Sequence, residues 1–172
     1  RESERIIPYS DMKKAIGTMN RLQDPKVMDD VGAAIAHLKG QSNAKSGAIG
    51  VTGFCMGGRY TYLAAAHHNQ DVKAAVCFYG GGIPMGDPSP LSRTGEITCP
   101  IYLFFGAKDP LIPMDQVGQI NTELTHKKVS FSMKVYPEAT HGFFCDERQS
   151  YNESAAKDSW EKLKTFFAQH LK

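Results

Sequence analysis

The stretch AIGVTGFCMGGRYTYLAAA, residues 48–66, decides the predicted fold. It begins as a short apolar run with β-branched residues and ends as an apolar run that favours a helix. Between the two lies Gly53-Phe54-Cys55-Met56-Gly57, which predicts a sharp turn from a strand into a helix. The central side chain of such a turn is exposed, and the flanking glycines let the backbone pass close to the helix. Cys55 is therefore a nucleophile, a redox-active thiol or a small buried apolar residue.

Apolar runs on both sides of this stretch alternate between strand and helix patterns. Besides residues 48–53, strands are predicted over the ranges 73–82, 100–106 and 130–137. Helices are predicted over the ranges 24–40, 57–68, 113–127 and 152–171. Strands that alternate with helices imply right-handed crossovers and a mainly parallel sheet covered on both faces. We therefore predict an α/β fold, with the sheet flanked by helices.

Two of the predicted helices carry clear apolar faces. In the helix of residues 24–40, with Asp24 as N-cap, this face comprises Val27, Val31, Ile35 and Leu38. In the helix of residues 152–171 it comprises Ala156, Trp160, Leu163 and Phe167. The Gly- and Pro-rich residues 81–99 are expected to form an irregular exposed loop between two strands.

The composition is that of an ordinary globular protein. The chain has 172 residues, of which 41% are hydrophobic and 22% charged, so residues 1–172 are expected to form a single domain. A net charge of +2, without a basic stripe, does not favour nucleic acid or anionic membranes as partners. No apolar run has the length of a membrane span, and the polar start RESER does not resemble a signal peptide. We expect a cytoplasmic protein that acts on a small molecule.

Four cysteines are present, and their spacing matches no zinc pattern. Cys77 lies within an apolar run and is expected to pack in the core, while Cys99 precedes Pro100 at the start of a strand. Cys145 is interpreted as a packing residue as well. No metal or cofactor is expected.

Chemically active residues follow three of the predicted strands. Cys55 comes after the strand of residues 48–53, Asp109 after that of residues 100–106, and His141 after that of residues 130–137. Parallel sheets of this kind bind ligands outside the carboxyl ends of their strands. Nucleophile, acid and histidine also stand in the chain order of α/β-hydrolases. The alternative is that Asp109, which precedes a proline, only initiates a turn and that Asp115 caps the next helix.

The motifs GFCMGGR, GAKDPLIP and ATHGFFCDER, followed by an amphipathic terminal helix, resemble the dienelactone hydrolases, or carboxymethylenebutenolidases. The resemblance covers about the last three quarters of the chain. It implies a triad of Cys55, Asp109 and His141 and the hydrolysis of a lactone or activated ester through an acyl-enzyme. It also implies that arginines hold an anionic substrate, for which Arg59 and Arg148 are the candidates. Arg148 could equally pair with a neighbouring acid such as Glu147 or Asp146.

The residue types suit this chemistry independently of the resemblance. His141 can take the thiol proton and return it to the leaving group, and Asp109 can orient the imidazole. The backbone N–H of Met56, directly after the nucleophile, is positioned to donate to the oxyanion. Gly142 is expected to leave room beside the imidazole. Two other classes of function stay open: a thiol-redox protein that uses Cys55 alone, and a catalytically silent binding domain.

The sequence before residue 48 contains no strong strand pattern, although α/β-hydrolases have further strands there. We therefore expect the chain to represent the C-terminal portion of the fold, with the amino-terminal part truncated. The strand of residues 48–53 would then have an uncovered edge. A missing amino-terminal segment, a second chain or a rearranged segment from residues 1–23 could cover it.

Overall fold

Four parallel strands form the centre of the computed structural model, which describes residues 7–8 and 11–172. The strands are β1 (Ile49–Phe54), β2 (Val72–Phe78), β3 (Ile101–Gly106) and β4 (Phe131–Tyr136). They are hydrogen-bonded in the order β1-β2-β3-β4, and every neighbouring pair is parallel. The predicted α/β class with a parallel sheet is confirmed.

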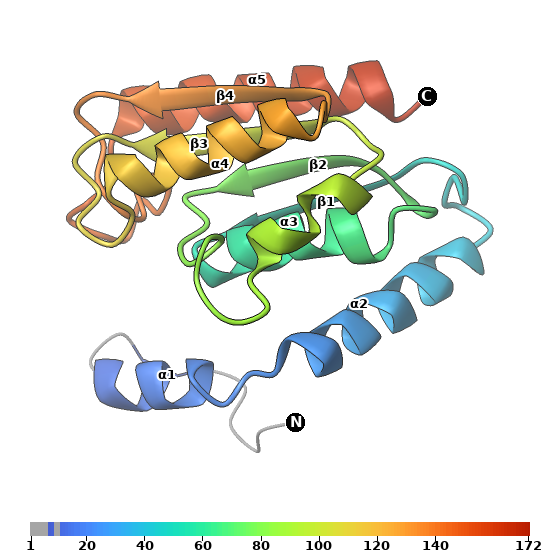
Figure 1. Cartoon of the computed structure of the whole chain (residues 1–172), viewed down its shortest axis with the longest axis horizontal. Helices are drawn as coiled ribbons and strands as arrows, with labels where there is room; N and C mark the ends of the chain where they lie inside the picture. Colours follow the sequence, from blue (N-terminus) through green and yellow to red (C-terminus); the bar gives the residue numbers. More distant parts are fainter. Residues whose placement is uncertain (1–6, 9–10) are drawn as a thin grey trace.

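Helices connect the strands and cover both faces of the sheet (Figure 1). Helix α3 (Met56–His67) follows β1, helix α4 (Met114–His126) follows β3, and helix α5 (Glu153–His170) follows β4. In Figure 1, α3 and α4 lie in front of the sheet and α5 lies behind it. Before the sheet come α1 (Met12–Met19) and α2 (Asp24–Lys39), and α2 lies alongside α3.

Two glycines of β1 show why a strand this close to its helices needs small residues. A side chain at Gly50 would meet Leu171 and Phe167 at the end of α5, the nearer atom at 2.7 Å. A side chain at Gly53 would meet the backbone oxygen of Gly57 in α3 at 2.3 Å. Because residues of opposite parity face opposite sides of a strand, α5 and α3 pack on the two faces of β1.

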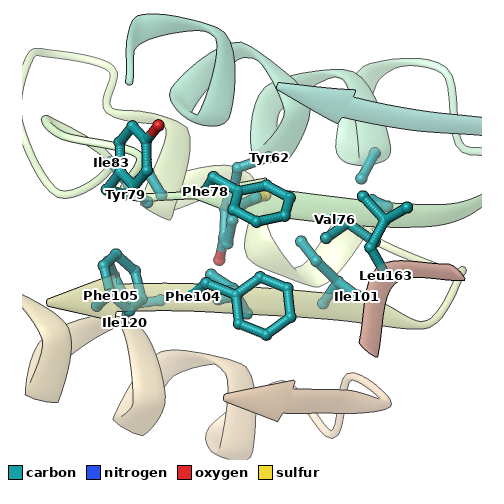
Figure 2. Packing of buried hydrophobic residues seen from close by; sticks show 14 of the residues in the cluster. Tyr62, Val76, Phe78, Tyr79, Ile83, Ile101, Phe104, Phe105, Ile120 and Leu163 are labelled. Carbon is teal, nitrogen blue, oxygen red and sulfur yellow. The ribbon is translucent and has the colours of Figure 1, made fainter. Parts of the chain in front are cut away.

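The core is formed chiefly by the two central strands. Strand β2 is buried at every position except Lys73, as expected for a strand covered on both faces. Phe78 of β2 and Phe104 of β3 are both completely buried, with ring centroids 4.9 Å apart. Figure 2 shows these two rings next to each other, and Leu163 of α5 lies at the end of the cluster away from Tyr79 and Phe105. The carboxyl ends of the strands are therefore held in fixed relative positions.

Details of several predicted helices and loops are different in the structure. Leu38 is 46% exposed and Trp160 is 44% exposed, so these two positions do not belong to the buried faces. Trp160 instead packs against Phe144, with ring centroids 6.0 Å apart. Gln23 is the N-cap of α2, and Asp24 is its first residue with a carboxylate that pairs with an arginine described below. Within the predicted irregular loop, residues Pro90–Glu96 form the 3₁₀ helix η1.

Strand β1 ends the sheet in the part of the chain that the structure describes, since it pairs with β2 only. The described residues of the segment 1–23 include helix α1 and contribute no strand to the sheet. Whether another segment or chain covers β1 stays a prediction. In the described residues, no helix is long and apolar enough to cross a membrane.

Candidate active site

Cys55 lies at the turn between β1 and α3 with an unusual backbone conformation. Its φ is +56° and its ψ is −120°, a region that residues other than glycine rarely adopt. The turn is fixed by hydrogen bonds: the N–H of Cys55 donates to the carbonyl of Phe78, and its own carbonyl accepts from the N–H of Arg59. The close contact of Gly53 with Gly57 leaves no space for a side chain at Gly53. The predicted sharp turn is therefore present, and its thiol is half-buried.

The structure brings together the side chains of Cys55, His141 and Asp109. The Nε2 atom of His141 lies 3.0 Å from Sγ of Cys55, and its Nδ1 atom lies 2.8 Å from Oδ2 of Asp109. The three residues follow three different strands whose carboxyl ends meet at one edge of the sheet (Figure 1). This connected arrangement has the geometry of a nucleophile, a base and a residue that orients the base.

The side chain of Asp109 makes more hydrogen bonds than the initiation of a turn requires. Its side chain is completely buried, and Oδ1 accepts hydrogen bonds from the N–H groups of Leu111 at 2.8 Å and Ile112 at 3.2 Å. Oδ2 remains directed at His141. The competing residue, Asp115, is exposed in the first turn of α4, whose N-cap is Pro113. Both oxygens of Asp109 are thus used, one for the loop and one for the histidine.

The contact between Cys55 and His141 favours the charged form of each. The hydrogen bond with His141 lowers the pKa of the Cys55 thiol, and this outweighs burial, which acts in the opposite direction. Burial disfavours the His141 imidazolium, but the hydrogen bonds to Asp109 and Cys55 outweigh it and raise the pKa of His141 to about 9. A thiolate beside an imidazolium is the reactive state of a nucleophilic cysteine.

Two further neighbours stabilise negative charge on the sulfur. The backbone N–H of Met56 hydrogen-bonds to the thiol, and the positive charge of Arg148 acts on it from a greater distance; both lower the pKa of Cys55. Met56 is the first residue of α3, so its N–H points out of the helix N-terminus, where negative charge is favoured.

The two arginines predicted to bind substrate have different surroundings. Arg59 donates from Nη1 and Nη2 to the two oxygens of Asp24, at 2.7 and 2.9 Å, and from Nε to the carbonyl of Gly82 at 3.3 Å. Arg148 is exposed, and its guanidinium lies near Gly142. Gly142 itself has a φ of +78°, and a side chain there would meet Ser150 and Arg148. This backbone conformation by itself favours glycine, and the predicted room beside the imidazole stays a prediction.

Two cavities adjoin Cys55. We call the first the methionine cavity; its volume is about 400 Å³, and it is lined by Met19, Cys55, Met56, Arg59, Gly81, Gly82, Met85, Gly86, Leu111 and His141. We call the second the aromatic cavity; its volume is about 460 Å³, and it is lined by Phe54, Cys55, Tyr79, Gly142, Phe144, Cys145, Asp146 and Arg148. Cys55 thus borders both cavities.

Tyr79 is a neighbour of the site that the sequence motifs do not indicate. It directly follows β2, has a φ of +36°, and its ring meets that of His141 edge-on with centroids 5.2 Å apart. Burial raises the pKa of Tyr79, so the phenol stays neutral. Its place at the carboxyl end of a strand is the signal that could have identified it.

The other cysteines are placed differently from Cys55. Cys77 and Cys99 are buried, and burial raises the pKa of both, to about 11 for Cys99. Cys145 is half-buried beside the aromatic cavity. The described residues contain no group of three or more His, Cys, Asp or Glu side chains that could hold a metal ion.

The sequence model of the dienelactone hydrolase family matches residues 5–171, nearly the whole chain. The chain belongs to this family. A protein of Synechocystis sp. that carries the name carboxymethylenebutenolidase is 42% identical over 151 residues, which cover 86% of the chain and 61% of the relative. A protein of the same name from Methylorubrum extorquens is 35% identical over 158 residues, covering 88% of the chain and 53% of the relative.

A solved structure supports the same assignment. The crystal structure of a protein from Klebsiella pneumoniae, which carries the name dienelactone hydrolase, superposes with a TM-score of 0.82 at 33% identity. The superposition covers 88% of this chain and 64% of that protein. This member of the dienelactone hydrolase family therefore has the α/β-hydrolase fold, and it spans about 53% to 64% of the length of these three relatives.

Proposed function

We propose that this chain hydrolyses lactones or activated esters through an acyl-enzyme formed on Cys55. The observation that carries the proposal is the continuous contact from Cys55 through His141 to Asp109, with distances of 3.0 and 2.8 Å. The names of its relatives, carboxymethylenebutenolidase and dienelactone hydrolase, denote lactone hydrolysis and point to the same reaction class. The low pKa of the thiol relative to an ordinary cysteine supplies the nucleophile.

The proposed reaction begins when the Cys55 thiolate attacks the carbonyl carbon of the ester and forms a tetrahedral intermediate. The N–H of Met56 donates to the oxyanion, and the His141 imidazolium gives its Nε2 proton to the leaving oxygen as the C–O bond breaks. Water then attacks the thioester; His141 takes its proton and returns it to the Cys55 sulfur as the acid is released. Asp109 orients the imidazole throughout and stabilises its positive charge.

Arg148 is a candidate for holding a substrate group that extends past the thiol into the aromatic cavity, which it lines. The role of Arg59 is different in our proposal, since Asp24 and Gly82 engage all three of its guanidinium nitrogens. We assign Arg59 to the wall of the methionine cavity and not to direct recognition of a carboxylate.

Hydrolysis of 4-nitrophenyl acetate by matched cysteine variants tests this function. Cys55→Ala should abolish turnover, because it removes the sulfur that contacts His141. Cys145→Ala is the matched control: Cys145 is also half-buried and lines the aromatic cavity, but it is not a member of the triad, so this variant should retain turnover. Combining Cys55→Ala with His141→Ala should cost little more than either change alone, since members of one catalytic unit are not additive. A protein that reacts with peroxide at Cys55 but hydrolyses no ester would instead support the thiol-redox alternative.

A further inference from the structure

We propose that the methionine cavity binds the acyl group of an uncharged, apolar ester, so that the chain prefers such esters to substrates with a carboxylate on the acyl group. This inference rests on the proposed function and specifies its substrate class. Three points support it. The ester carbonyl reaches the thiol from the methionine cavity, the lining of this cavity is largely apolar, and its arginine, Arg59, is already paired with Asp24.

The groups that act on the ester lie on the side of the methionine cavity. Met56, whose N–H is proposed to bind the oxyanion, and His141, which is proposed to protonate the leaving group, both line this cavity. The aromatic cavity is lined by Cys55 but by neither of these two residues. We therefore place an ester carbonyl that contacts both groups on the methionine-cavity side of Sγ.

The side chains of this cavity are apolar and adaptable. Three methionines, Met19, Met56 and Met85, line it together with Leu111. Methionine is unbranched and flexible, and it accommodates apolar groups of varied shape. Met85 and Leu111 are 59% and 63% exposed, so both extend from the cavity toward solvent, where an alkyl chain could cover them.

Among the described residues that line this cavity, the cationic side chains are already paired, so none is available to bind a substrate carboxylate. Arg59 is 13% exposed in its side chain, and Asp24 meets its guanidinium with both carboxylate oxygens. His141 faces the Cys55 sulfur and Asp109. A carboxylate in this cavity would have to give up water and compete with Asp24 for Arg59, whereas an alkyl chain gains by leaving water.

The acyl group is the part of the substrate that this cavity must hold longest. After the alcohol leaves, the acyl group stays bonded to Cys55 until water releases it, and the attacking water must reach its carbonyl beside His141. Apolar contacts that fix the acyl chain therefore act in both chemical steps. A longer acyl chain should accordingly raise kcat/KM.

A series of 4-nitrophenyl esters with unbranched acyl chains, used below their critical micelle concentrations, measures this preference. Full transfer of one CH₂ from water amounts to roughly fourfold. Because the cavity is partly open to solvent, we expect a smaller factor of about 1.8-fold per CH₂, and thus a rise in kcat/KM of about tenfold over the four CH₂ groups that separate butanoate from octanoate. Equal or falling values along the series would overturn the inference while leaving the hydrolase function intact.

Polar substitutions at the exposed rim test whether the methionine cavity causes the preference. Met85→Gln and Leu111→Asn should reduce the rise in kcat/KM along the series from about tenfold to about threefold. Leu38→Asn is the matched control, because Leu38 is 46% exposed on α2 and does not line the cavity. An unchanged rise in both rim variants would contradict the assignment of the acyl group to this cavity.

A charged substrate of matched length tests the second half of the inference. The 4-nitrophenyl monoester of glutaric acid and 4-nitrophenyl pentanoate have acyl chains of the same length and differ in the terminal carboxylate. We expect kcat/KM at least tenfold higher for the pentanoate, and an equal or higher value for the glutarate would overturn the inference. If no ester in either comparison is hydrolysed and Cys55 is never acylated, the proposed function itself fails.

Discussion

The Nδ1 atom of His141 lies 2.8 Å from Oδ2 of Asp109, although the two residues follow different strands and are 32 positions apart in the sequence. The same carboxylate accepts two backbone N–H groups of its own loop through Oδ1. Its position is therefore set by the loop after β3, and the histidine is oriented by a group that cannot move independently.

Asp109→Asn should separate these two tasks. The amide oxygen can still accept the backbone hydrogen bonds, so the melting temperature should change little, but an amide facing Nδ1 favours the wrong imidazole tautomer. We expect kcat for ester hydrolysis to fall by roughly 1,000-fold or more. Asp115→Asn is the control, since Asp115 is exposed in α4 and should leave kcat unchanged. A loss of less than tenfold in Asp109→Asn would argue against an orienting role.

The two glycines that flank the nucleophile turn should respond differently to alanine. A Cβ at Gly53 would lie 2.3 Å from the oxygen of Gly57, so Gly53→Ala must displace the turn and should lower both activity and melting temperature. A Cβ at Gly57 meets nothing within 4 Å, and alanine is favoured in a helix, so Gly57→Ala should be tolerated. Thermal unfolding and esterase rates of the two variants test this; equal effects would contradict the geometry.

The pH dependence of kcat/KM should have two limbs. Because the pKa of Cys55 is lowered, the thiolate forms below the ordinary thiol value of roughly 8.5, and kcat/KM should rise to a plateau below that pH. Above about 9, His141 loses the proton that it gives to the leaving group, so kcat/KM should fall.

The leaving group provides the control for this pH profile. An alkyl ester needs the proton of His141, whereas 4-nitrophenolate leaves without one, so the alkaline limb should be strong for the first and weak for the second. The proton on His141 also contributes to the free energy of unfolding. Since the pKa of His141 is raised on folding, its contribution is complete below the unfolded value of roughly 6.5 and is lost as the pH rises through about 9. A profile that rises without limit to high pH for alkyl esters would contradict His141 as the acid.

Removing the carboxylate that pairs with Arg59 should change which substrates are accepted. In Asp24→Asn, the guanidinium keeps its position near Gly82 but loses its counter-charge. The ratio of kcat/KM for the glutarate monoester to that for the pentanoate ester should therefore rise by about fivefold, a gain of about 1 kcal/mol in charge attraction. Asp71→Asn, which removes the partner of Lys39, serves as the control and should leave the ratio unchanged.

Much of the fold could be predicted because apolar runs and glycines mark each strand clearly. The first strand was expected over residues 48–53 and is found at Ile49–Phe54. The side on which a helix packs was harder to predict. Trp160 shares the helical period of buried residues in α5, yet it lies 44% exposed against Phe144, because the loop after β4 returns beside this helix. Periodicity alone does not contain that tertiary contact.

The candidate site could be predicted only where the fold itself brings residues together. Cys55, Asp109 and His141 each follow a strand, and neighbouring parallel strands end at one edge, so their proximity follows from topology. The pairing of Arg59 with Asp24 depends instead on how α2 packs against α3, for which no local pattern exists. Asp24 precedes a proline at a helix start, so the sequence favoured the simpler interpretation of an N-cap.

The most direct test of the account is to identify the residue that carries the acyl group during turnover. The protein is mixed with 4-nitrophenyl acetate, quenched in acid within the first turnovers, and analysed by intact mass and peptide mapping. We predict one acetyl group on the peptide that contains Cys55, formed with a burst of 4-nitrophenolate and lost again as substrate is exhausted. Hydrolysis that proceeds with Cys55 unmodified, or an acetyl group on Cys77, Cys99 or Cys145 instead, would contradict the proposed mechanism.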